Sequence, residues 1–461
     1  MEATQEHENK MGTMPIPRLL ASMALPAIIS MFVQAMYNVV DSIFVAQVSE
    51  NALTAVSLAF PIQMIIVSCA VGMGVGINSG ISRRLGEKRK DAAENIAEHG
   101  LVIAVILSAV LAVAGALTAH AFVSMFTDVE EIINGCTVYL TVVCVFCFGG
   151  IVTQAGFATL QGSGEMIQPM IGQLIGAVTN IVLDPIMIFG LLGFPAMGVK
   201  GAAIATVSGE ILAMVYIIAI VRFRKKNILK PRLKGFKFQG AIVKDIIEVG
   251  LPAAVMQGIS SFMVTFYNLI LTQYGTTAIA VFGVFFKVQS FIFMPVFGLC
   301  QGAMPIYGYN FGAKKPRRFI TNAKVSSLVC ECIMIVGFLL FQLFPKQIFT
   351  LFSASPDMMG LGVQCFRVIS FSFFTAGISI PLSNAFQAVG KAYISMFSSF
   401  LRQMILLIPF SWLFSYFWGV DWIWMGFVVS DALNLVFILL MFKKLKKNAL
   451  DPMLKIEEAM G

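Results

Sequence analysis

The chain has 461 residues, of which 58% are hydrophobic and only 12% are charged. An ordinary soluble domain carries roughly 25% charged residues, so this composition excludes a soluble globular protein and predicts a chain surrounded mostly by lipid. The formal net charge of +8 could indicate a nucleic-acid partner. However, the basic residues are confined to short segments between apolar stretches, where membrane topology explains them, and no nucleic acid is expected.

Twelve apolar stretches follow one another along the chain, each near or above the roughly 20 residues that cross a bilayer as a helix. They are continuous, unlike the short alternating segments of a spanning β-barrel, so the predicted fold class is an all-α membrane protein. The stretches cover residues 19–45, 53–81, 96–122, 132–151, 169–192, 201–221, 246–274, 276–305, 326–344, 361–389, 393–418 and 422–442. The polar start, 1–18, is expected to be a loose tail without a cleavage site, and 443–461 to be a C-terminal tail.

The loops on one side of the predicted bundle carry most of the basic residues. By the positive-inside rule this side is cytoplasmic, and because the number of helices is even, both termini are predicted to lie there, in the plasma membrane. The basic residues are Arg83, Arg84, Lys88, Arg89 and Lys90, then Arg222, Arg224, Lys225, Lys226, Lys230, Arg232, Lys234 and Lys237, then Lys314, Lys315, Arg317 and Arg318. The alternate loops carry mainly Glu50, Asp128, Glu130, Glu131 and Asp421, with Lys346 as the exception.

The chain repeats itself at a fixed offset. ALPA around Pro26 recurs as GLPA around Pro252, which gives 252 − 26 = 226 residues between the prolines. The same offset then holds without a gap along most of each half: it relates Phe60 to Phe286, Gln63 to Gln289, Gly72 to Gly298, Gly76 to Gly302, Gly86 to Gly312, Gln161 to Gln387 and Gly164 to Gly390. The sequence therefore contains two sister halves.

Each half holds six helices, so both halves enter the membrane from the same side and are related by a pseudo-two-fold axis along its normal. The predicted domains are an N-terminal bundle at 19–221, a basic cytoplasmic linker at 222–245 and a C-terminal bundle at 246–442. Rocking of one bundle against the other is the usual route to alternating access. The alternative is a duplicated scaffold without transport. One chain holds both halves, so a monomer is sufficient.

The first helix combines a bend with a polar face. Pro26 removes a backbone hydrogen bond and makes this helix the most readily bent in its bundle, so it is the predicted hinge. Gln34, Tyr37, Asn38 and Asp41 are spaced by three and four residues, which places them on one face of an otherwise apolar helix. A carboxylate inside a membrane costs about 2.5 to 3.5 kcal/mol, so Asp41 needs a partner or a function.

The fifth helix offers a matching face. Gln173, Asn180 and Asp184 recur at spacings of seven and four, with Gly176 between them to admit a neighbouring backbone. The repeat places Tyr267, Leu406 and Phe410 at the positions of Asp41, Asn180 and Asp184, so the second half folds without these polar groups. This difference favours a function over a scaffold role. Two carboxylates with amide oxygens can bind Na⁺ or share protons, and either serves as a coupling site.

Other polar residues have more than one interpretation. Arg402 and Asp431, on the last two helices, are expected to form a structural charge pair, whereas Glu210 and Glu331 could attract a cationic compound or line a wet crevice.

Cys144 and Cys147 form a CxxC, but no His lies nearby and no metal, structural or catalytic, is expected there. The 27 Met and 41 Phe residues supply adaptable apolar surface, and the candidate cavity residues are Gln34, Met36, Asn38, Gln154 and Met256.

Several motifs resemble those of the MATE family, whose name denotes multidrug and toxic compound extrusion. They are the Leu-Pro of the first helix, YNVVDSIFVAQV at its end, LGEKRKDAAE after the second helix, QGSG after the fourth and FGAKKPRRF in the second half, so the resemblance runs over about 15–447. It implies a secondary antiporter that exports cationic or amphipathic organic compounds in exchange for H⁺ or Na⁺.

In MATE proteins whose ion site lies in the N-terminal bundle, the first and fifth helices carry the residues matched here by Asp41, Asn180 and Asp184. Tyr37 and Tyr139 fit the same pattern, and Thr206 is the best candidate for the hydroxyl expected on the sixth helix. No Walker loop is present, so ATP is not expected to drive transport, and neither enzymatic activity nor a cofactor is expected. The rival interpretations are a lipid-linked saccharide flippase of related fold, which would need a more basic cavity, and a channel or membrane receptor.

Overall fold

The computed structural model describes residues 9–224, 226–232 and 235–460, and every regular element among them is helical. Ten of these helices are long and apolar enough to cross a membrane, and two further pairs, bent by 41° and 48°, bring the number to as many as 12 if each pair is one span. The predicted all-α membrane fold is confirmed. Lys225 and Lys234, which the sequence places in the basic linker, lie outside the described residues.

The chain forms two compact units. The N-unit is Ile29–Ala254, and the C-unit comprises the described residues of Met1–Ile28 and Val255–Gly461. These divisions fall inside two helices, whereas the sequence placed the boundary at the linker, 222–245, which is part of the N-unit. The N-unit therefore includes the start of the first helix of the second half, and the C-unit includes the start of the first helix of the first half.

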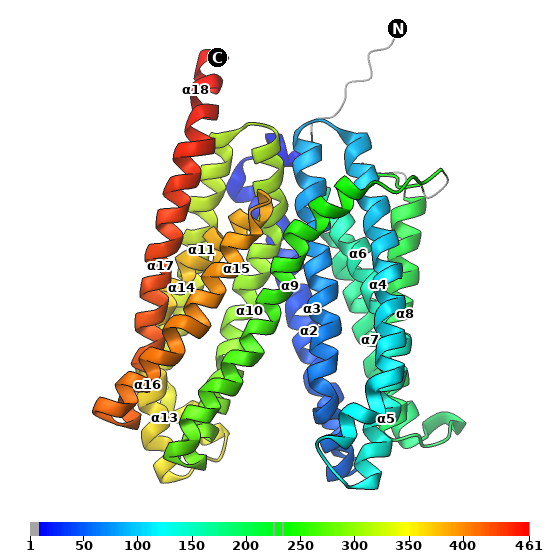
Figure 1. Cartoon of the computed structure of the whole chain (residues 1–461), viewed down its shortest axis with the longest axis vertical. Helices are drawn as coiled ribbons and strands as arrows, with labels where there is room; N and C mark the ends of the chain where they lie inside the picture. The colour runs from blue at the N-terminus through cyan, green and yellow to red at the C-terminus, as the bar shows by residue number, and fades with distance from the viewer. Residues whose placement is uncertain (1–8, 225, 233–234, 461) are drawn as a thin grey trace. The chain divides into compact units, whose positions relative to one another are not determined.

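The helices of the N-unit run roughly side by side (Figure 1). In chain order, the N-unit contains the end of α2 (Ile16–Ala46), α3 (Glu50–Gly86), α4 (Lys90–Ser124), α5 (Glu130–Val145), α6 (Phe148–Gly162), α7 (Ile167–Phe189), η1 (Leu191–Gly193), α8 (Val199–Phe223) and the start of α9 (Gly240–Leu271). The pair α5 and α6 is the one bent by 41°. The sequence predicted a single span ending at 151, whereas the helical pair continues to Gly162.

The C-unit has a corresponding set of helices. After α1 (Lys10–Thr13) and the start of α2, it contains the rest of α9, η2 (Thr272–Tyr274), α10 (Thr276–Gly312), α11 (Pro316–Leu343), α12 (Pro345–Leu351), α13 (Pro356–Ile369), α14 (Ser372–Ala388), α15 (Ala392–Phe400), η3 (Leu401–Leu406), α16 (Leu407–Trp418), η4 (Val420–Trp422), α17 (Met425–Leu445), η5 (Lys446–Leu450) and α18 (Asp451–Met460). The bend of 48° separates α13 from α14, and η3 is a π-helical turn inside a spanning helix.

Repeated glycines let two helices approach closely in each unit. In the N-unit, a Cβ on Gly72 of α3 would lie 2.5 Å from the carbonyl oxygen of Gly250 on α9. In the C-unit, a Cβ on the repeat-related Gly298 of α10 would lie 2.7 Å from the Cα of Ile28 on α2. Only glycine fits at such crossings, because a side chain would push the backbones apart. The offset of 226 therefore reproduces a helix crossing as well as a sequence pattern.

Both predicted tails are more ordered than the sequence indicated. From Asn9 onward the N-terminal segment is not loose, since Arg318 and Asn310 donate hydrogen bonds to the carbonyl oxygen of Met11, at 3.1 Å each. The predicted C-terminal tail continues the last spanning helix through η5 and α18 as far as Met460. There, Arg317 forms an ion pair with Glu458 at 2.9 Å.

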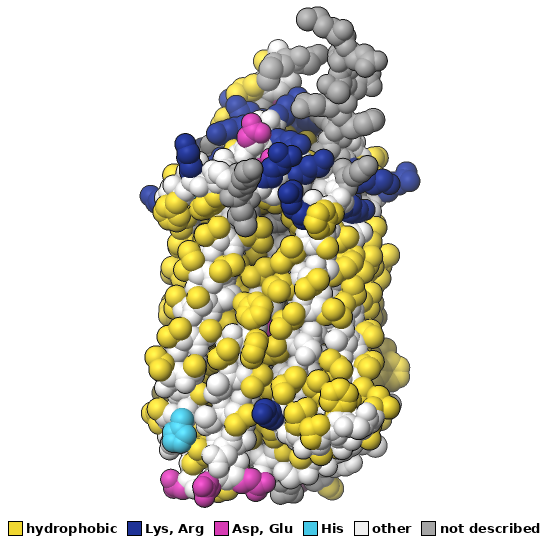
Figure 2. Space-filling view, turned by 90° about the vertical axis from the view of Figure 1, so that its right-hand side faces the viewer, with side chains coloured by type: hydrophobic (Ala, Val, Ile, Leu, Met, Phe, Trp, Pro, Cys, Tyr) yellow, Lys and Arg dark blue, Asp and Glu magenta, His cyan; other side chains and the backbone are white. Residues whose placement is uncertain are grey.

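Charge separates the two ends of the N-unit. One end holds the turn between α3 and α4, the linker and the start of α9, where Arg83 and Arg84 form ion pairs with Asp245 at 3.0 and 3.3 Å. The other end holds Asp128, Glu130 and Glu131, together with Lys200, which the sequence analysis did not single out. Figure 2 shows basic side chains gathered at one end of the face that includes α4 and α8, acidic ones at the other, and hydrophobic side chains between them.

Candidate functional site

Polar side chains from three helices of the N-unit meet inside an apolar bundle. Asn180 on α7 donates hydrogen bonds from Nδ2 to Asp184 Oδ1 and to Thr206 Oγ1 on α8, each at 3.3 Å. The carboxyl group of Asp184 also lies within hydrogen-bonding range of that of Asp41 on α2. Asp184 is 0% exposed and Asn180 is 2% exposed. The structure thus brings together the four residues that the sequence singled out on three separate helices.

A close crossing of α7 and α8 positions this cluster. A Cβ on Gly209 would lie 2.5 Å from the carbonyl oxygen of Gly176 and 3.4 Å from the Cβ of Asn180. Because Asn180 is one turn beyond Gly176 on α7, the glycine contact sets how far its amide group lies from Thr206. The neighbouring backbone that Gly176 was expected to admit is that of α8.

Three oxygens of the cluster have no hydrogen-bond partner: Asp41 Oδ1, Asn180 Oδ1 and Asp184 Oδ2. Among the described residues, no Lys or Arg forms an ion pair with Asp41 or Asp184. Buried oxygens without a donor are costly, and two ionised carboxylates in contact repel each other. A cation or a shared proton between these oxygens removes both penalties, and carboxylate and amide oxygens are the ligands that hard cations prefer.

Two tyrosines border the cluster. Tyr37 on α2 is in hydrogen-bonding contact with Thr206, and both Tyr37 and Tyr139 on α5 are close enough to interact electrostatically with Asp41. Gln63 on α3 donates a hydrogen bond from Nε2 to the hydroxyl of Tyr139 at 2.9 Å. Gln63 was not among the predicted site residues, because Gln289 occupies the same position in the second half. An amide inside an otherwise apolar helix was the signal that could have identified it.

Glu210 adds a third carboxyl group on the same side of the bundle, one turn beyond Thr206 on α8. The backbone N–H of Gly150 donates to this carboxylate at the first turn of α6, and a Cβ on Gly150 would lie 2.9 Å from Glu210 Oε2. Glu210 is also close enough to interact with Tyr37 and Tyr139. A carboxylate satisfies the free N–H groups at a helix start, so Glu210 stabilises the bend between α5 and α6.

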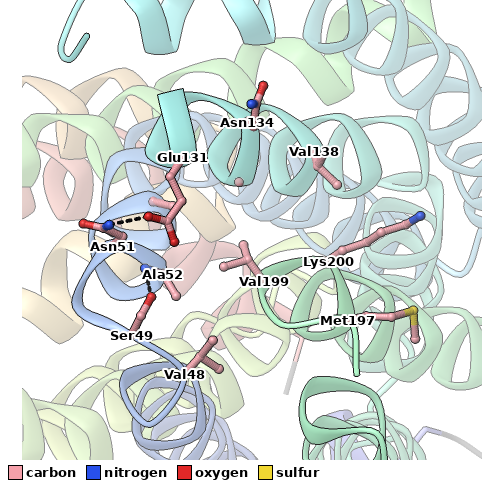
Figure 3. Close-up of a pocket in the computed structure, with 12 residues that line it drawn as sticks. Val48, Ser49, Asn51, Ala52, Glu131, Asn134, Val138, Met197, Val199 and Lys200 are labelled. Atoms are coloured by element: carbon pink, nitrogen blue, oxygen red, sulfur yellow. Dashed lines mark hydrogen bonds between the residues drawn. The ribbon is translucent and has the colours of Figure 1, made fainter. Parts of the chain in front are cut away.

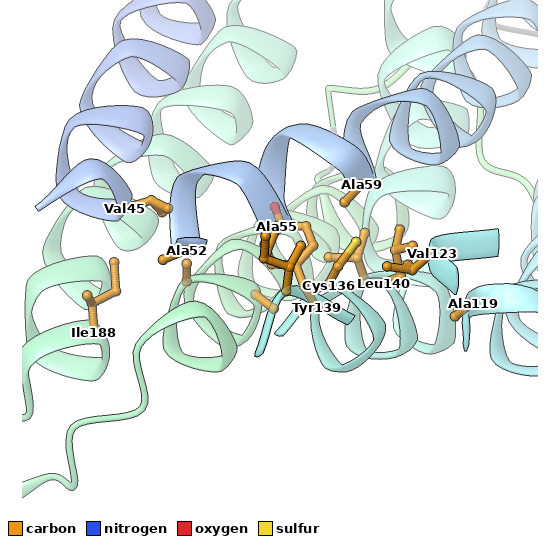
Figure 4. Close-up of a cluster of buried hydrophobic side chains, with 14 residues drawn as sticks. Val45, Ala52, Ala55, Ala59, Ala119, Val123, Cys136, Tyr139, Leu140 and Ile188 are labelled. Carbon is orange, nitrogen blue, oxygen red and sulfur yellow. The ribbon is translucent and has the colours of Figure 1, made fainter. Parts of the chain in front are cut away.

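An apolar cluster of buried side chains borders the site in the N-unit, and Figure 4 shows its members. Its buried members are Val45, Ala52, Ala55, Ala59, Ala119, Val123, Ile132, Cys136, Tyr139, Leu140, Val143, Ile188, Ala202 and Ala203. Val45 follows Asp41 by one helical turn, Ile188 follows Asp184 by one turn, and Ala202 precedes Thr206 by one turn. The apolar cluster therefore begins about one helical turn from the polar residues, toward the acidic end.

A pocket of about 380 Å³ lies beside this apolar cluster, between the ends of α3, α5 and α8. Figure 3 shows Asn51 and Glu131 on one side of it, joined by a hydrogen bond of 2.6 Å, and Lys200 with Met197 on the other. Ala52 and Ala55 line this pocket and also belong to the apolar cluster. The pocket thus borders the apolar cluster directly.

The other predicted residues lie apart from this cluster. Gln34, Met36 and Asn38 are exposed on α2, and Gln154 on α6 contacts Gly74, all in the N-unit. Met256 belongs to the C-unit, where its sulfur accepts a hydrogen bond from Gln387 at 4.0 Å.

Pro26 lies inside α2, just before the division between Ile28 and Ile29. In the C-unit, Arg402 Nη1 lies 3.2 Å from Asp431 Oδ1, in an ion pair. Among the described residues, no group of three or more His, Cys, Asp or Glu side chains could hold a metal ion.

Comparison with known proteins places the chain in a family. The MatE family model matches residues 26–186 and again 252–413, and the two matches start 252 − 26 = 226 residues apart, which is the repeat offset. Among curated relatives, the chain is 26% identical to a protein from Shewanella oneidensis named FAD transporter, with 91% of this chain and 92% of the relative covered.

A second relative, from Thermotoga maritima, is named probable multidrug resistance protein NorM and is 25% identical, with 92% of each chain covered. A solved structure described as the outward-facing conformation of a multidrug resistance MATE family transporter superposes with a TM-score of 0.89 at 26% identity, covering 96% of this chain and 99% of that one. Because the family model covers both halves, the chain belongs to the MATE family of multi-pass membrane transporters.

Proposed function

We propose that this protein is a secondary active antiporter that expels cationic or amphipathic organic compounds while H⁺ or Na⁺ flows inward. The observation that carries the proposal is the oxygen cluster of Asp41, Asn180 and Asp184. It holds two carboxyl groups in contact and three oxygens without a donor, yet no Lys or Arg among the residues that the structure describes forms an ion pair with it. Such a cluster binds a travelling cation more readily than it serves as a structural element.

The cation reaches the cluster from the acidic end of the N-unit. By the positive-inside rule this end is outside the cell, and both termini are cytoplasmic, in the plasma membrane. The pocket lined by Glu131 and Lys200 lies on this route, and the apolar cluster that includes Ala52 and Ala55 lies between the pocket and the carboxyl groups. Small side chains open a path with little rearrangement, because only a few apolar contacts are lost.

Cation binding is coupled to the shape of α2. Pro26 leaves one backbone carbonyl of α2 without its usual N–H partner, so bending the helix at this point costs little free energy. Asp41 lies further along the same helix, so a change in its contact with Asp184 alters the force on the hinge. Thr206 and Tyr37 transmit the same change to α8, because they join α2 to that helix.

In the N-unit, substrate contacts are proposed on Gln34, Met36 and Asn38, which are exposed, and on the half-buried Gln154. In the C-unit, they are proposed on Met256. Met and aromatic surfaces adapt to flat lipophilic cations of several shapes. FAD is a second candidate substrate, because the relative from Shewanella oneidensis is named FAD transporter. A single chain carries both halves of the repeat, so we propose that the monomer is functional.

Efflux of a fluorescent cationic dye from vesicles tests this proposal, with H⁺ and Na⁺ gradients imposed separately. Asp41→Asn and Asp184→Asn are expected to abolish the response to the driving gradient while leaving the protein folded. Asp421→Asn is the matched control, because this carboxylate is exposed on the short helix η4 of the C-unit. Wild-type, gradient-driven efflux by both site variants would overturn the assignment of the site.

A further inference from the structure

A groove opens on the face of the N-unit formed by α4, α6 and α8. The helix α6 packs against both α4 and α8, whereas α4 and α8 make little contact with each other. The floor of the groove is therefore α6, which contributes Gly156 and Thr159, and the walls are Leu101 on α4 and Ile218 and Val221 on α8. At the basic end the groove widens into a cavity of about 490 Å³.

The linker covers this cavity. The backbone N–H groups of Lys230 and Arg232 donate hydrogen bonds to Glu94 and Glu98 on α4, at 3.0 and 2.7 Å. These two bonds hold the intervening Pro231, which is buried, over the cavity. The roof is thus fixed to one wall of the groove by side chains of α4.

Two arginines line the rim of the cavity. Arg222, at the end of α8, and Arg232, in the linker, are both exposed, and neither guanidinium group forms an ion pair with any described carboxylate. The nearby Arg224 differs, because it is neutralised by Glu165 at 3.1 Å. Glu98 is the acidic group beside Arg232, and one of its oxygens is occupied by the backbone of the linker. The rim therefore offers two guanidinium groups with no anionic partner.

The depth of the cavity matches the boundary between the apolar and polar parts of a membrane. Below the arginines, the apolar walls continue toward side chains that face outward on α4 and α8, where Val105 is 58% exposed and Val215 is 55% exposed. Figure 2 views this face and shows hydrophobic side chains directly below the basic ones. A molecule seated here meets arginine at one end and hydrocarbon at the other.

We propose that this cavity binds an anionic glycerophospholipid. The phosphate group lies against Arg222 and Arg232, since guanidinium groups bind phosphate through paired N–H donors. The glycerol and the start of one acyl chain fill the cavity, and the chain leaves along the groove between α4 and α8. A basic pocket between membrane helices on the cytoplasmic side is the usual setting for lipid headgroup recognition. This site is independent of the ion cluster, so it stands even if the proposed transport mechanism fails.

Native mass spectrometry of the purified full-length protein tests the site, with phosphatidylglycerol and phosphatidylcholine added separately. The wild-type protein is expected to retain phosphatidylglycerol in preference to phosphatidylcholine. Replacing both arginines with glutamine, R222Q together with R232Q, is expected to weaken phosphatidylglycerol binding by about fivefold per charge. Arg89→Gln with Lys226→Gln is the charge-matched control, because both bases are exposed at the same end but do not line the cavity.

A second pair of variants tests the groove without changing charge. Leu101→Trp fills the cavity and is expected to reduce lipid binding at least as much as loss of one arginine. Leu117→Trp places the same side chain about 24 Å further along α4, where residue 117 is 78% exposed and lies outside the cavity, and is expected to leave binding unchanged. Thermal unfolding of each variant confirms that the fold is retained.

Three outcomes would overturn the proposal: equal binding of both lipids, equal losses in the charge variants and their controls, or equal losses in Leu101→Trp and Leu117→Trp. Displacement of phosphatidylglycerol by millimolar inorganic phosphate or glycerophosphate would also contradict it, because the cavity would then recognise a soluble anion rather than a lipid.

Discussion

The contact between Gly176 and Gly209 provides a quantitative test of how the ion cluster is held. In Gly209→Ala, the new Cβ would lie 2.5 Å from the Gly176 carbonyl oxygen, whereas ordinary contacts begin at 3.4 Å. The helices α7 and α8 must therefore separate locally by about 0.9 Å at this point. Asn180 and Thr206 are 3.3 Å apart, so a shift of this size takes their hydrogen bond beyond its normal range.

Overpacking of this kind costs about 1–3 kcal/mol of folding free energy. The appropriate control is Gly258→Ala on α9, because a Cβ there meets nothing within 4 Å and alanine favours a helix. Thermal unfolding of the purified protein and gradient-driven dye efflux are measured for both variants. Gly209→Ala is expected to lose stability and most of its efflux, whereas Gly258→Ala is expected to lose neither. Equal behaviour of the two variants would refute the argument that this glycine contact positions Asn180.

Three further predictions concern other parts of the N-unit. Gly150→Leu is expected to displace the carboxylate of Glu210 from the start of α6 and to slow efflux severalfold, and a variant with wild-type efflux would contradict the proposed role of this bend. His99→Ala removes the acceptor for a backbone N–H of the linker, so trypsin is expected to cleave the linker faster than in the control His120→Ala, and equal rates would show that His99 does not hold the linker. Asp245→Asn breaks two partly exposed ion pairs and is expected to cost about 1 kcal/mol at low salt and less at high salt, and a loss that salt does not change would argue against an electrostatic role.

Composition and the repeat predicted most of the fold. Long apolar stretches require helices because lipid offers no partner for backbone polar groups, and the offset of 226 predicted two related halves. The helix breaks were less predictable. The break between α5 and α6 contains no proline, and the start of α6 is satisfied by Glu210, which lies 210 − 150 = 60 residues from Gly150 in sequence. A carboxylate that satisfies a distant helix start leaves no local signal in the sequence.

The candidate site could be predicted only in part, because the residues could be identified but their packing could not. Asp41 and Asp184 were identifiable because charge inside an apolar helix is costly and because the second half lacks both. Their approach to one another could not be derived from either helix alone, since it depends on how the helices of the N-unit pack. Gln63 could not be identified in this way. Both halves carry glutamine at this position, so a comparison of the halves could not distinguish a functional residue from a structural one.

In the proposed mechanism, the carboxyl groups of Asp41 and Asp184 capture the coupling cation. Infrared difference spectroscopy of the purified protein measures this capture, by recording the carboxyl absorption as pH or Na⁺ concentration changes. We expect a band that reports protonation or ion binding in the wild-type protein and disappears when both residues are replaced by asparagine. An unchanged difference spectrum in the double variant would contradict it.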